Sequence, residues 1–319
     1  NLYEHRFTHN CDSDELSSIM SKSVRVAGDT PAFEKSRFVG MGEVSTLDRQ
    51  FLAERHLVSR EFLHNSANRG LVVNHTEDLC LMINEEDHLR LQAYGSGLDL
   101  AGTYEKAARL DNELTAELDI AFSERYGYLT ACPTNVGTGL RVSVLIHLPG
   151  LVHSREINKL LESLGKLNHT MRGFYGEGSE VMGNFFQLSN SATLGASEEA
   201  LIKRLREMAT KVVGFERKAR EMLFSKARSL LEDKVWRAYG LLRYAHSVST
   251  KEALSLISAV RLGVGVGIVE DVSIKTLNHL LVYTQPAHLQ RMKGNTMDAQ
   301  ERDVARAEYI RRALARITP

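Results

Sequence analysis

Three segments that are far apart in the chain carry residue types that could bind a charged ligand. The first, Asn84–Arg90, has three acidic residues in a row, followed by a histidine and an arginine. Glu85 and Glu86 could face a cation while Arg90 faces an anion. Taken alone, a solvated turn between a strand and a helix is the commoner explanation, because acidic residues often occupy such turns.

The second segment, Cys132–Arg141, begins with a thiol directly before a proline and continues with small residues. Small residues let the main chain approach a ligand closely, and Arg141 opens the next predicted strand. Two other interpretations stay open, an inert buried thiol at Cys132 and an ordinary hairpin loop.

The third segment, Arg172–Glu180, places three glycines around Glu177. This composition is typical of a mobile loop, which can close over a substrate and deliver a carboxylate. A surface connection with incidental charge has the same composition and, on composition alone, is the commoner case.

Other patterns in the chain are incomplete. Gly263, Gly265 and Gly267 alternate with valines but complete neither a P-loop nor a dinucleotide motif. His5 and His9 have the helical spacing of metal ligands but lack a third ligand, so we expect no metal site. Three widely spaced cysteines allow neither a disulfide framework nor a CxxC zinc site.

The composition describes a globular protein without a whole-chain charge bias. The 319 residues are 43% hydrophobic, and 40 Lys and Arg balance 40 Asp and Glu. We therefore expect neither nucleic acid nor a membrane as a partner. No apolar run approaches the roughly 20 residues that span a bilayer, and residues 1–14 lack the apolar centre of a signal peptide, which predicts a cytoplasmic location.

The apolar pattern predicts two regions of different secondary structure. In the first, strands alternate with helices, and the clearest strands are Gly70–Val73 and Leu79–Ile83. From Ser197 onward the chain reads as successive amphipathic helices. The sequence thus predicts an α+β fold with an antiparallel sheet flanked by helices, followed by an all-helical C-terminal domain. We place the two domains at 1–220 and 221–319.

The remaining predicted elements complete this pattern. The predicted helices are Leu47–Leu63, Thr103–Arg125, Ser154–Asn168, Glu198–Glu232, Val235–Tyr244, Lys251–Leu262 and Asp298–Ile317. The further predicted strands are Gly127–Thr130, Arg141–Leu148 and Phe185–Leu188.

Taken together and in this order, the three segments resemble the catalytic core of the phosphagen (guanidino) kinase family. The resemblance covers residues 1 to about 220. The variants Met82–His88 (MINEEDH) and Tyr175–Glu180 (YGEGSE) are most similar to the bacterial protein-arginine kinases of that family. The resemblance implies an antiparallel sheet cradled by helices, in agreement with the predicted strands.

The resemblance also implies roles for individual residues. Glu86 matches a carboxylate that binds the guanidinium, Glu177 matches its partner on the loop, and Cys132 matches the active-site thiol. In ATP binding, the resemblance implies that His56 packs against the adenine and that Arg90, Arg141 and Arg172 hold the phosphates. Two stretches are also implied to contact the nucleotide. The first is Arg141, Val142, Ser143, Val144 and Leu145, and the second is Arg172, Gly173, Phe174, Tyr175, Gly176 and Glu177.

The chemistry of a guanidinium agrees with these roles. Its pKa lies above about 12, so in water it is protonated and a poor nucleophile. Two carboxylates can orient its planar fork while one of them takes a proton. Arginines and Mg²⁺ can neutralise the charge that collects on the phosphate oxygens of ATP. Acidic and basic groups must therefore meet from distant parts of the chain.

A fourth segment, Glu301–Ala307, resembles the RDxxRA motif of the protein-arginine kinases, where it implies an allosteric phosphoarginine pocket. Arg302 and Arg306 are four positions apart and share a helix face, so they could hold a phosphate while Asp303 holds a guanidinium. A charged helix face with internal ion pairs explains the same residues.

The resemblance implies an enzyme that uses ATP and Mg²⁺ to phosphorylate arginine side chains of proteins in a stress response. It also implies an activator protein and a Clp-type unfoldase and protease as partners, and the long amphipathic helices favour a homo-oligomer. Two alternatives stay open, a kinase of free arginine or another small guanidino compound and a catalytically silent phosphoarginine-binding regulator.

The start of the sequence bears on both the phosphate site and the acceptor. The resemblance predicts a segment of the type SSRxRLAR, with further phosphate-binding arginines, directly before Asn1. Small-molecule guanidino kinases carry an N-terminal helical domain that closes over the acceptor. The given sequence contains no counterpart, which favours an open site and a protein-sized acceptor.

Overall fold

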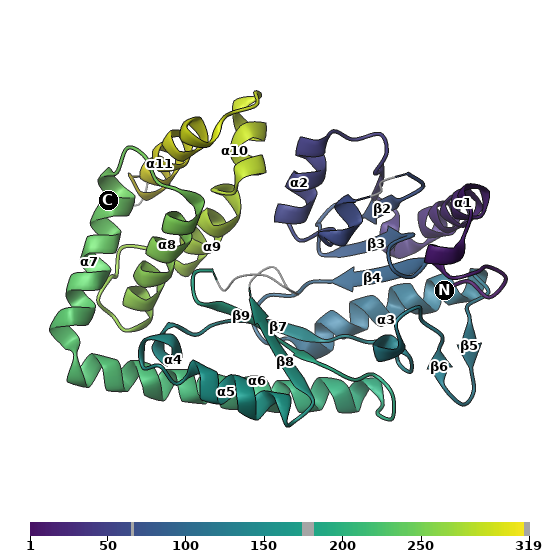
Figure 1. The fold of residues 1–319 in the computed structure, drawn as a ribbon, viewed down its shortest axis with the longest axis horizontal. Coiled ribbons are helices and arrows are strands. Elements are labelled where there is room, and N and C mark those ends of the chain that lie inside the picture. Colours follow the sequence, from purple (N-terminus) through teal and green to yellow (C-terminus); the bar gives the residue numbers. More distant parts are fainter. Residues whose placement is uncertain (65–66, 174–181, 316–319) are drawn as a thin grey trace. The chain divides into compact units, whose positions relative to one another are not determined.

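The computed structural model describes residues 1–64, 67–173 and 182–315. By its internal contacts the chain divides into two compact units (Figure 1). The first unit comprises residues 1–142 and 190–206, and the second comprises residues 143–189 and 207–319.

The centre of the first unit is a four-stranded antiparallel sheet in the order β1-β2-β3-β4. Its strands are Arg37–Gly40 (β1), Gly70–Val73 (β2), Leu79–Ile83 (β3) and Leu89–Ala93 (β4). All residues of β2 and β3 are buried, which requires cover on both faces of the sheet. This explains why both strands read as continuous apolar runs.

Side chains of the central strands alternate between two apolar clusters, as the period of two in a strand requires. On one face, Leu81 and Ile83 pack with Ile19 of helix α1 (Ser13–Asp29) and Leu110 of helix α3 (Leu100–Glu117). On the other face, alternating residues of the same strands pack with residues of the segment between β1 and β2. This second cluster comprises Met41, Leu57, Val58, Phe62, Leu71, Val73, Cys80 and Met82.

Helices and short strands complete the first unit. A capping box between Asp12 and Glu15 begins helix α1. The elements are α1 (Ser13–Asp29), α2 (Thr46–Glu54), α3 (Leu100–Glu117), β5 (Phe122–Ser123), β6 (Gly127–Tyr128) and the 3₁₀ turns η1 (Thr8–Asn10), η2 (Pro31–Phe33), η3 (Glu61–Leu63) and η4 (Pro133–Asn135). Helix α6 spans Glu198–Lys226.

The second unit contains a three-stranded sheet and a bundle of helices. The strand order is β7-β9-β8, with β7 (Ser143–His147) antiparallel to β9 (Phe185–Asn190) and β8 (His169–Gly173) at the edge. The helices are α4 (Pro149–His153), α5 (Ile157–Gly165), α7 (Arg228–Tyr244), α8 (Thr250–Gly265), α9 (Ile274–Tyr283), α10 (Pro286–Lys293) and α11 (Ala299–Ala315).

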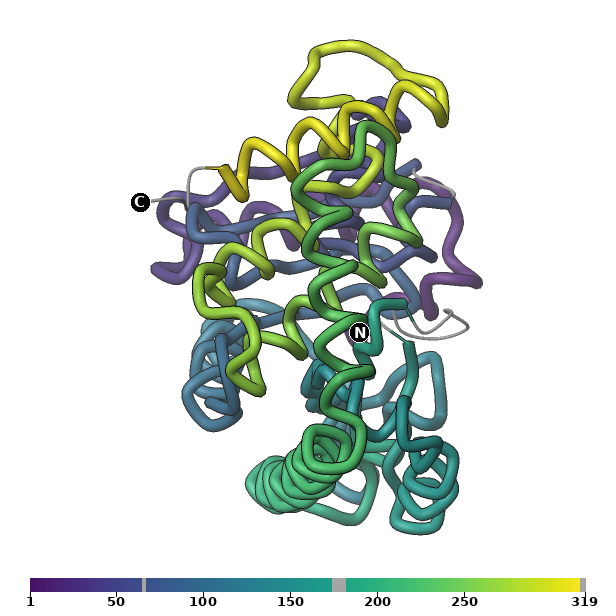
Figure 2. The backbone as a smooth tube through the Cα atoms, turned by 90° about the vertical axis from the view of Figure 1, so that its left-hand side faces the viewer, coloured from purple at the N-terminus to yellow at the C-terminus, as the bar shows by residue number. Residues whose placement is uncertain are grey.

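One apolar core joins the helices of the bundle. Helix α7 lies alongside α8 and also contacts α11 (Figure 2). Apolar residues of these three helices and of α9 form a continuous buried cluster that also includes Phe185 at the start of β9. The sheet of this unit is therefore anchored in the same core as the C-terminal helices.

The predicted fold class is confirmed, and the strands predicted at Gly70–Val73 and Leu79–Ile83 have the predicted bounds. The predicted ends of several helices are wrong, because the backbone leaves the helical conformation while the apolar pattern of the sequence continues. The helix predicted to Arg125 ends at Glu117, since Leu118 is extended. The helix predicted over Glu198–Glu232 breaks at Ala227, which leaves the helical region at φ −138 and ψ 36.

Two further corrections concern the helix predicted before β2 and the segment Asn84–Arg90. The helix predicted over Leu47–Leu63 ends at Glu54, ahead of His56 with a φ of +60. Strand β4 was not predicted, so the acidic segment joins two strands rather than a strand and a helix. The boundary at residue 220 falls inside α6 and stays a prediction.

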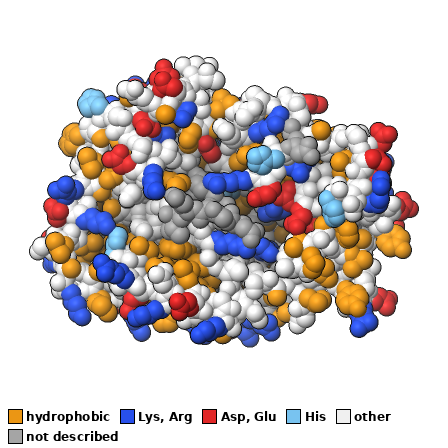
Figure 3. Space-filling view, in the orientation of Figure 1, with side chains coloured by type: hydrophobic (Ala, Val, Ile, Leu, Met, Phe, Trp, Pro, Cys, Tyr) orange, Lys and Arg blue, Asp and Glu red, His pale blue; other side chains and the backbone are white. Residues whose placement is uncertain are grey.

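The surface agrees with the balanced composition. Acidic and basic side chains are interspersed over the face drawn in Figure 3, in line with equal numbers of the two in the sequence. Among the described residues, no helix has both the length and the apolar composition that crossing a membrane requires.

Candidate functional site

The turn between β3 and β4 presents the acidic segment, and its main chain is fixed on both sides. The amide of Asn84 donates to the carbonyl oxygen of His88 at 2.9 Å, which closes the turn. Asn84 has a φ of +62, and its side-chain amide donates to the carbonyl oxygens of Leu16 at 2.8 Å and Asn68 at 2.7 Å. The turn is thus pinned to α1 and to the residues before β2.

Glu85 points into the protein and is fully engaged there. Its carboxylate accepts hydrogen bonds from Ser59 Oγ at 2.5 Å, Arg90 Nη1 at 3.0 Å and the amide of Glu86 at 2.9 Å. Burial opposes its ionisation, but Arg90, Ser59 and the Glu86 amide outweigh burial, so the pKa of Glu85 is lowered. Glu85 is therefore an ionised carboxylate that holds Arg90 in place.

Glu86 points to the solvent side of the same turn and has the opposite electrostatics. Partial burial, followed by the neighbouring charges of Asp87 and Glu85, raises the pKa of Glu86. A hydrogen bond with the side chain of Cys132 counteracts part of this shift. An accessible carboxylate with a raised pKa can both accept a proton and bind a cation. The resemblance assigns Glu86 and Cys132 to one site, and that assignment stays a prediction.

Asp87 joins the turn to the segment that carries Cys132. Its Oδ1 accepts a hydrogen bond from the amide of Ala131 at 2.7 Å and another from the side chain of Asn1. Cys132 follows directly and is partly exposed, with its Sγ 3.0 Å from Thr134 Oγ1. The Glu86–Cys132 contact thus depends on Asp87.

The small residues after Cys132 allow a close approach of two main-chain segments. Gly137 has a φ of +113, and a Cβ there would lie 2.6 Å from the carbonyl oxygen of Thr193. The Thr193 hydroxyl donates to the carbonyl oxygens of Thr134 at 3.0 Å and Val136 at 2.7 Å. The close approach to Thr193 and Leu194 therefore explains why Gly137 has no side chain.

Arg90, Arg141 and His56, all in the first unit, are accessible or half-buried. Arg141 is exposed and contacts Asn135 Oδ1 through Nη2 at 3.3 Å. Burial first, and Arg60 second, lower the pKa of His56, which favours its neutral ring. Val142 donates its amide to Asn190 Oδ1 at 2.8 Å.

The other residues implied in nucleotide binding belong to the second unit. Ser143 and Leu145 on β7 are exposed, Val144 between them is half-buried, and Gln187 of β9 donates to Ser143 Oγ at 2.9 Å. Arg172 on β8 is half-buried and Gly173 is buried. Phe174, Tyr175, Gly176 and Glu177 lie outside the described residues, so the predicted meeting of Glu177 with Glu86 stays a prediction.

The motif on α11 is only partly accessible. Arg306 is fully buried, and its guanidinium donates to the carbonyl oxygens of Thr284 and Val248, each at 2.8 Å, and to Asp303 Oδ1 at 2.6 Å. Arg302 is half-buried and donates to the carbonyl oxygen of Met297 at 2.6 Å. In this conformation Arg306 stabilises the bundle, while the phosphoarginine pocket stays a prediction.

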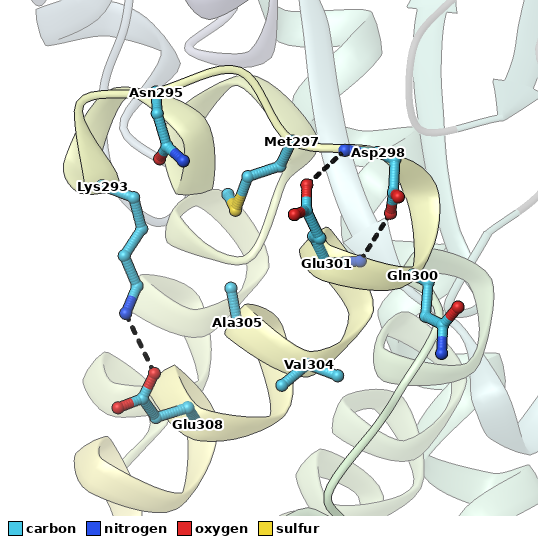
Figure 4. Close-up of a pocket in the computed structure, with 9 residues that line it drawn as sticks. All are labelled: Lys293, Asn295, Met297, Asp298, Gln300, Glu301, Val304, Ala305 and Glu308. Carbon is cyan, nitrogen blue, oxygen red and sulfur yellow. Dashed lines mark hydrogen bonds and ion pairs between the residues drawn. The ribbon is translucent and has the colours of Figure 1, made fainter.

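An open pocket of about 450 Å³ lies beside this motif, between the end of α10 and the outer face of α11 (Figure 4). Lys293 and Glu308 form an ion pair of 3.0 Å at one end of it. Its lining is Lys293, Asn295, Met297, Asp298, Gln300, Glu301, Val304, Ala305 and Glu308. Arg302, Asp303 and Arg306 are not among these residues. Across the described ranges, no group of His, Cys, Asp and Glu is arranged to hold a metal ion.

Sequence reasoning missed Ser59 and the role of Asp87. A lone serine in a loop carries no pattern, and the hydrogen bond from Ala131 to Asp87 joins positions more than 40 residues apart. The consecutive acidic residues were the only available signal for Asp87.

Two family models match the chain. Residues 18–219 match the model described as ATP:guanido phosphotransferase, C-terminal catalytic domain. Residues 228–319 match the model described as Protein-arginine kinase McsB C-terminal domain.

Curated relatives and solved structures are also similar. A protein named protein-arginine kinase from Halothermothrix orenii is 41% identical to this chain, and the match covers 97% of this chain and 88% of that protein. Another protein of that name, from Syntrophomonas wolfei, is 45% identical, and the match covers 89% of this chain and 81% of that protein. A lombricine kinase structure has a TM-score of 0.59 at 22% identity, covering 66% of this chain and 62% of that one. A duplicated taurocyamine kinase from Schistosoma mansoni has a TM-score of 0.63 at 21% identity, covering 82% and 41%. The structural matches support the fold, and the sequence matches show that this chain belongs to the protein-arginine kinase branch of the ATP:guanido phosphotransferase family.

Proposed function

We propose that this protein transfers the γ-phosphoryl group of ATP to arginine side chains of proteins. The observation that carries the proposal is that two adjacent glutamates have different surroundings. Glu85 is buried and bound to Ser59 and Arg90, whereas Glu86 is exposed and contacts Cys132. One carboxylate thus positions a cationic side chain, and the other is available to an incoming cation.

The proposed reaction assigns the proton and the charge to these groups. Glu86 binds the guanidinium of the acceptor arginine and takes a proton from the attacking nitrogen. A nitrogen–phosphorus bond forms as the bond from the γ-phosphorus to the bridging oxygen of ADP breaks. The raised pKa of Glu86 suits a base that must accept a proton during the reaction. We further propose Glu177 as the second carboxylate on the guanidinium.

The residues that the family resemblance implies in ATP binding are proposed as the nucleotide contacts. Arg90, oriented by Glu85, would neutralise phosphate charge as the γ-phosphoryl group leaves. The remaining proposed contacts are His56 at the adenine, Arg141 and Arg172 at phosphates, and Val142, Ser143, Val144, Leu145, Gly173, Phe174, Tyr175 and Gly176 along the nucleotide. Mg²⁺ would be bound by the phosphates of ATP, where it supplies further charge neutralisation.

The wider setting of this activity is part of the same proposal. The similarity to proteins named protein-arginine kinase over most of the chain supports a protein acceptor over free arginine. Recognition of phosphoarginine by Arg302, Asp303 and Arg306 and partnership with an activator protein and a Clp-type protease rest on the motif resemblance. A homo-oligomer is proposed from the long amphipathic helices, and a cytoplasmic location is proposed from the distribution of apolar residues.

A direct assay separates the proposal from its alternatives. The protein is incubated with ATP, Mg²⁺ and an arginine-rich protein or, in parallel, free arginine, and ADP release and phosphoarginine are measured without acid treatment. We expect phosphoarginine on the protein and little turnover of free arginine. Faster turnover of free arginine would favour a small-molecule kinase. Phosphoarginine binding without ATP turnover would favour a regulator.

A further inference from the structure

The end of β7 and the residues directly before β9, called here the β7–β9 junction, are held by a side chain of the C-terminal bundle. Ser258 of α8 is fully buried, and its Oγ accepts a hydrogen bond from Asn184 Nδ2 at 2.8 Å. His147 Nε2 lies 2.8 Å from the same oxygen. His147 ends β7, and Asn184 directly precedes β9. One hydroxyl group therefore links both strands of the junction to α8.

The main chain at this junction also lies directly against α8. Gly183 has a φ of +60, and a Cβ there would lie 3.0 Å from the carbonyl oxygen of Leu254. The carbonyl oxygen of Asn184 accepts a hydrogen bond from the amide of Leu148 at 2.9 Å. Asn184 itself has a φ of +58, a conformation that a side-chain anchor helps to maintain. The approach of Gly183 to Leu254 is independent of the Ser258 hydroxyl and places the same segment on the same helix.

The N-terminal end of α8 is held by the motif on α11. The amide of Val248 donates to the carbonyl oxygen of Asp303 at 3.2 Å, and its carbonyl oxygen accepts from Arg306 Nη1 at 2.8 Å. Val248 directly precedes Ser249, whose side chain caps α8. From Ser249 to Ser258 the helix extends roughly 14 Å, at 1.5 Å per residue. Both ends of one helical segment are thus fixed by buried polar contacts.

We propose that Ser258 is a positioning residue for nucleotide binding and that α8 connects the β7–β9 junction to Asp303 and Arg306. Strand β7 carries Ser143 and Leu145, so this inference rests on the nucleotide contacts of the proposed function. A shift of α8 at Val248 moves Ser258 and, with it, the end of β7. The C-terminal helices thereby set the geometry of a strand in the ATP site.

The variants follow from this geometry. Ser258→Ala removes the shared oxygen with little change in volume, and Ser255→Ala on an exposed position of the same helix is the matched control. Asn184→Gly removes the amide group while glycine keeps the positive φ, so it tests the same contact if Ser258→Ala does not fold. At the N-terminal end of α8, the variant is Arg306→Lys. Its control is Arg312→Lys, because the Arg312 side chain is 71% exposed.

Two measurements on the full chain test the proposal. Amide hydrogen exchange is followed at residues 146–148 and 185–188, and ADP affinity is measured by calorimetry. Ser258→Ala and Asn184→Gly should each speed exchange there by about tenfold and weaken ADP binding about fivefold, because a displaced strand no longer matches the nucleotide. The double variant should add little to Ser258→Ala, since the contact that Asn184→Gly breaks is already lost when the Ser258 hydroxyl is removed. Arg306→Lys should speed exchange at the same amides.

The outcomes distinguish this inference from the proposed function. Unchanged exchange and ADP affinity in Ser258→Ala or Asn184→Gly would overturn the positioning role. Faster exchange at the junction in Arg312→Lys as much as in Arg306→Lys would overturn the connection through α8. A wild-type protein that binds ADP but forms no phosphoarginine would contradict the proposed function alone, because neither measurement here requires turnover.

Discussion

The Oδ1 atom of Asp87 lies 2.7 Å from the amide nitrogen of Ala131, and this hydrogen bond joins the β3–β4 turn to the segment that carries Cys132. Glu86 precedes Asp87, and Cys132 follows Ala131. The contact between the Glu86 and Cys132 side chains is therefore flanked by a hydrogen bond from a main-chain amide to a side-chain carboxylate, one residue away on each side. Asp87 also contributes to the raised pKa of Glu86.

Replacing Asp87 separates its two effects. Asp87→Ala should lower kcat/KM about tenfold, because the Glu86–Cys132 geometry loosens. Asp87→Asn keeps an acceptor for the Ala131 amide and should stay within about threefold of wild type. Both remove a charge that raises the pKa of Glu86, so the acid limb of the activity profile should move to lower pH in both.

Alkylation of Cys132 by iodoacetamide gives a readout apart from turnover. In a Cys11→Ser background, Asp87→Ala should change the alkylation rate of Cys132 and Asp87→Asn should not. Buried Cys80 serves as the unreactive internal reference. Equal turnover and equal alkylation in the two Asp87 variants would show that the tether has no role.

His147 is expected to make stability depend on pH. Burial first, then Arg220 and Arg261, lower its pKa from 6.5 to about 2 in the folded protein. Below pH 6.5 the unfolded chain therefore binds a proton that the folded protein excludes, so stability is lost as the pH falls from 6.5 towards 2.

Melting temperatures of wild type and His147→Gln between pH 7.5 and 5 test this expectation. As the pH falls, the melting temperature of the wild type should decrease more than that of the variant. The difference between the two melting temperatures should therefore become smaller. His75→Gln, at an exposed position, should remain parallel to wild type. A constant difference between wild type and His147→Gln at every pH would contradict the account.

Arg306 should stabilise the bundle in a way that lysine cannot reproduce. Its guanidinium contacts two carbonyl oxygens and Asp303 from a buried position, whereas lysine has a single charged nitrogen on a flexible stem. Arg306→Lys should lower the free energy of unfolding by about 2 kcal/mol in urea titrations. Arg312→Lys on the exposed face of α11 should change it by less than about 0.5 kcal/mol. Equal stability of the two variants would mean that these contacts contribute nothing.

The sequence predicted the elements whose patterns are local. Gly70–Val73 and Leu79–Ile83 are continuous apolar runs because both faces of the sheet are covered, and their bounds were predicted correctly. Strand β4 was missed although Leu89, Leu91 and Ala93 alternate with Arg90 and Gln92, which is the period of two of a half-buried strand. Ala227 has good helical propensity, so nothing local announces that α6 ends before it.

The site shows the same division. The resemblance predicted Glu177 as the partner of Glu86 and Cys132 as the active-site thiol, and these roles stay predictions. The contact between Glu86 and Cys132 was not predicted. The contacts of Glu85 with Ser59 and of Asp87 with Ala131 could not be predicted, since they join segments distant in sequence. Spacing places Arg302 and Arg306 on one helix face, but only the packing of α11 decides that Arg306 is buried.

The central claim is that the Glu86 carboxylate binds the acceptor guanidinium and takes its proton. The most direct measurement is kcat for protein-arginine phosphorylation by Glu86→Gln, with ADP affinity measured alongside. Glutamine keeps the shape of the side chain but neither the charge nor the basicity. Glu61→Gln, at an exposed position near η3, is the matched control.

We predict that Glu86→Gln lowers kcat by at least about 100-fold, the usual contribution of a positioned base, while ADP affinity changes less than about twofold. In the wild type, kcat should rise with pH through a pKa above the ordinary glutamate value of 4.5. Glu86→Gln turning over within about twofold of wild type, with the same dependence on pH, would contradict the account.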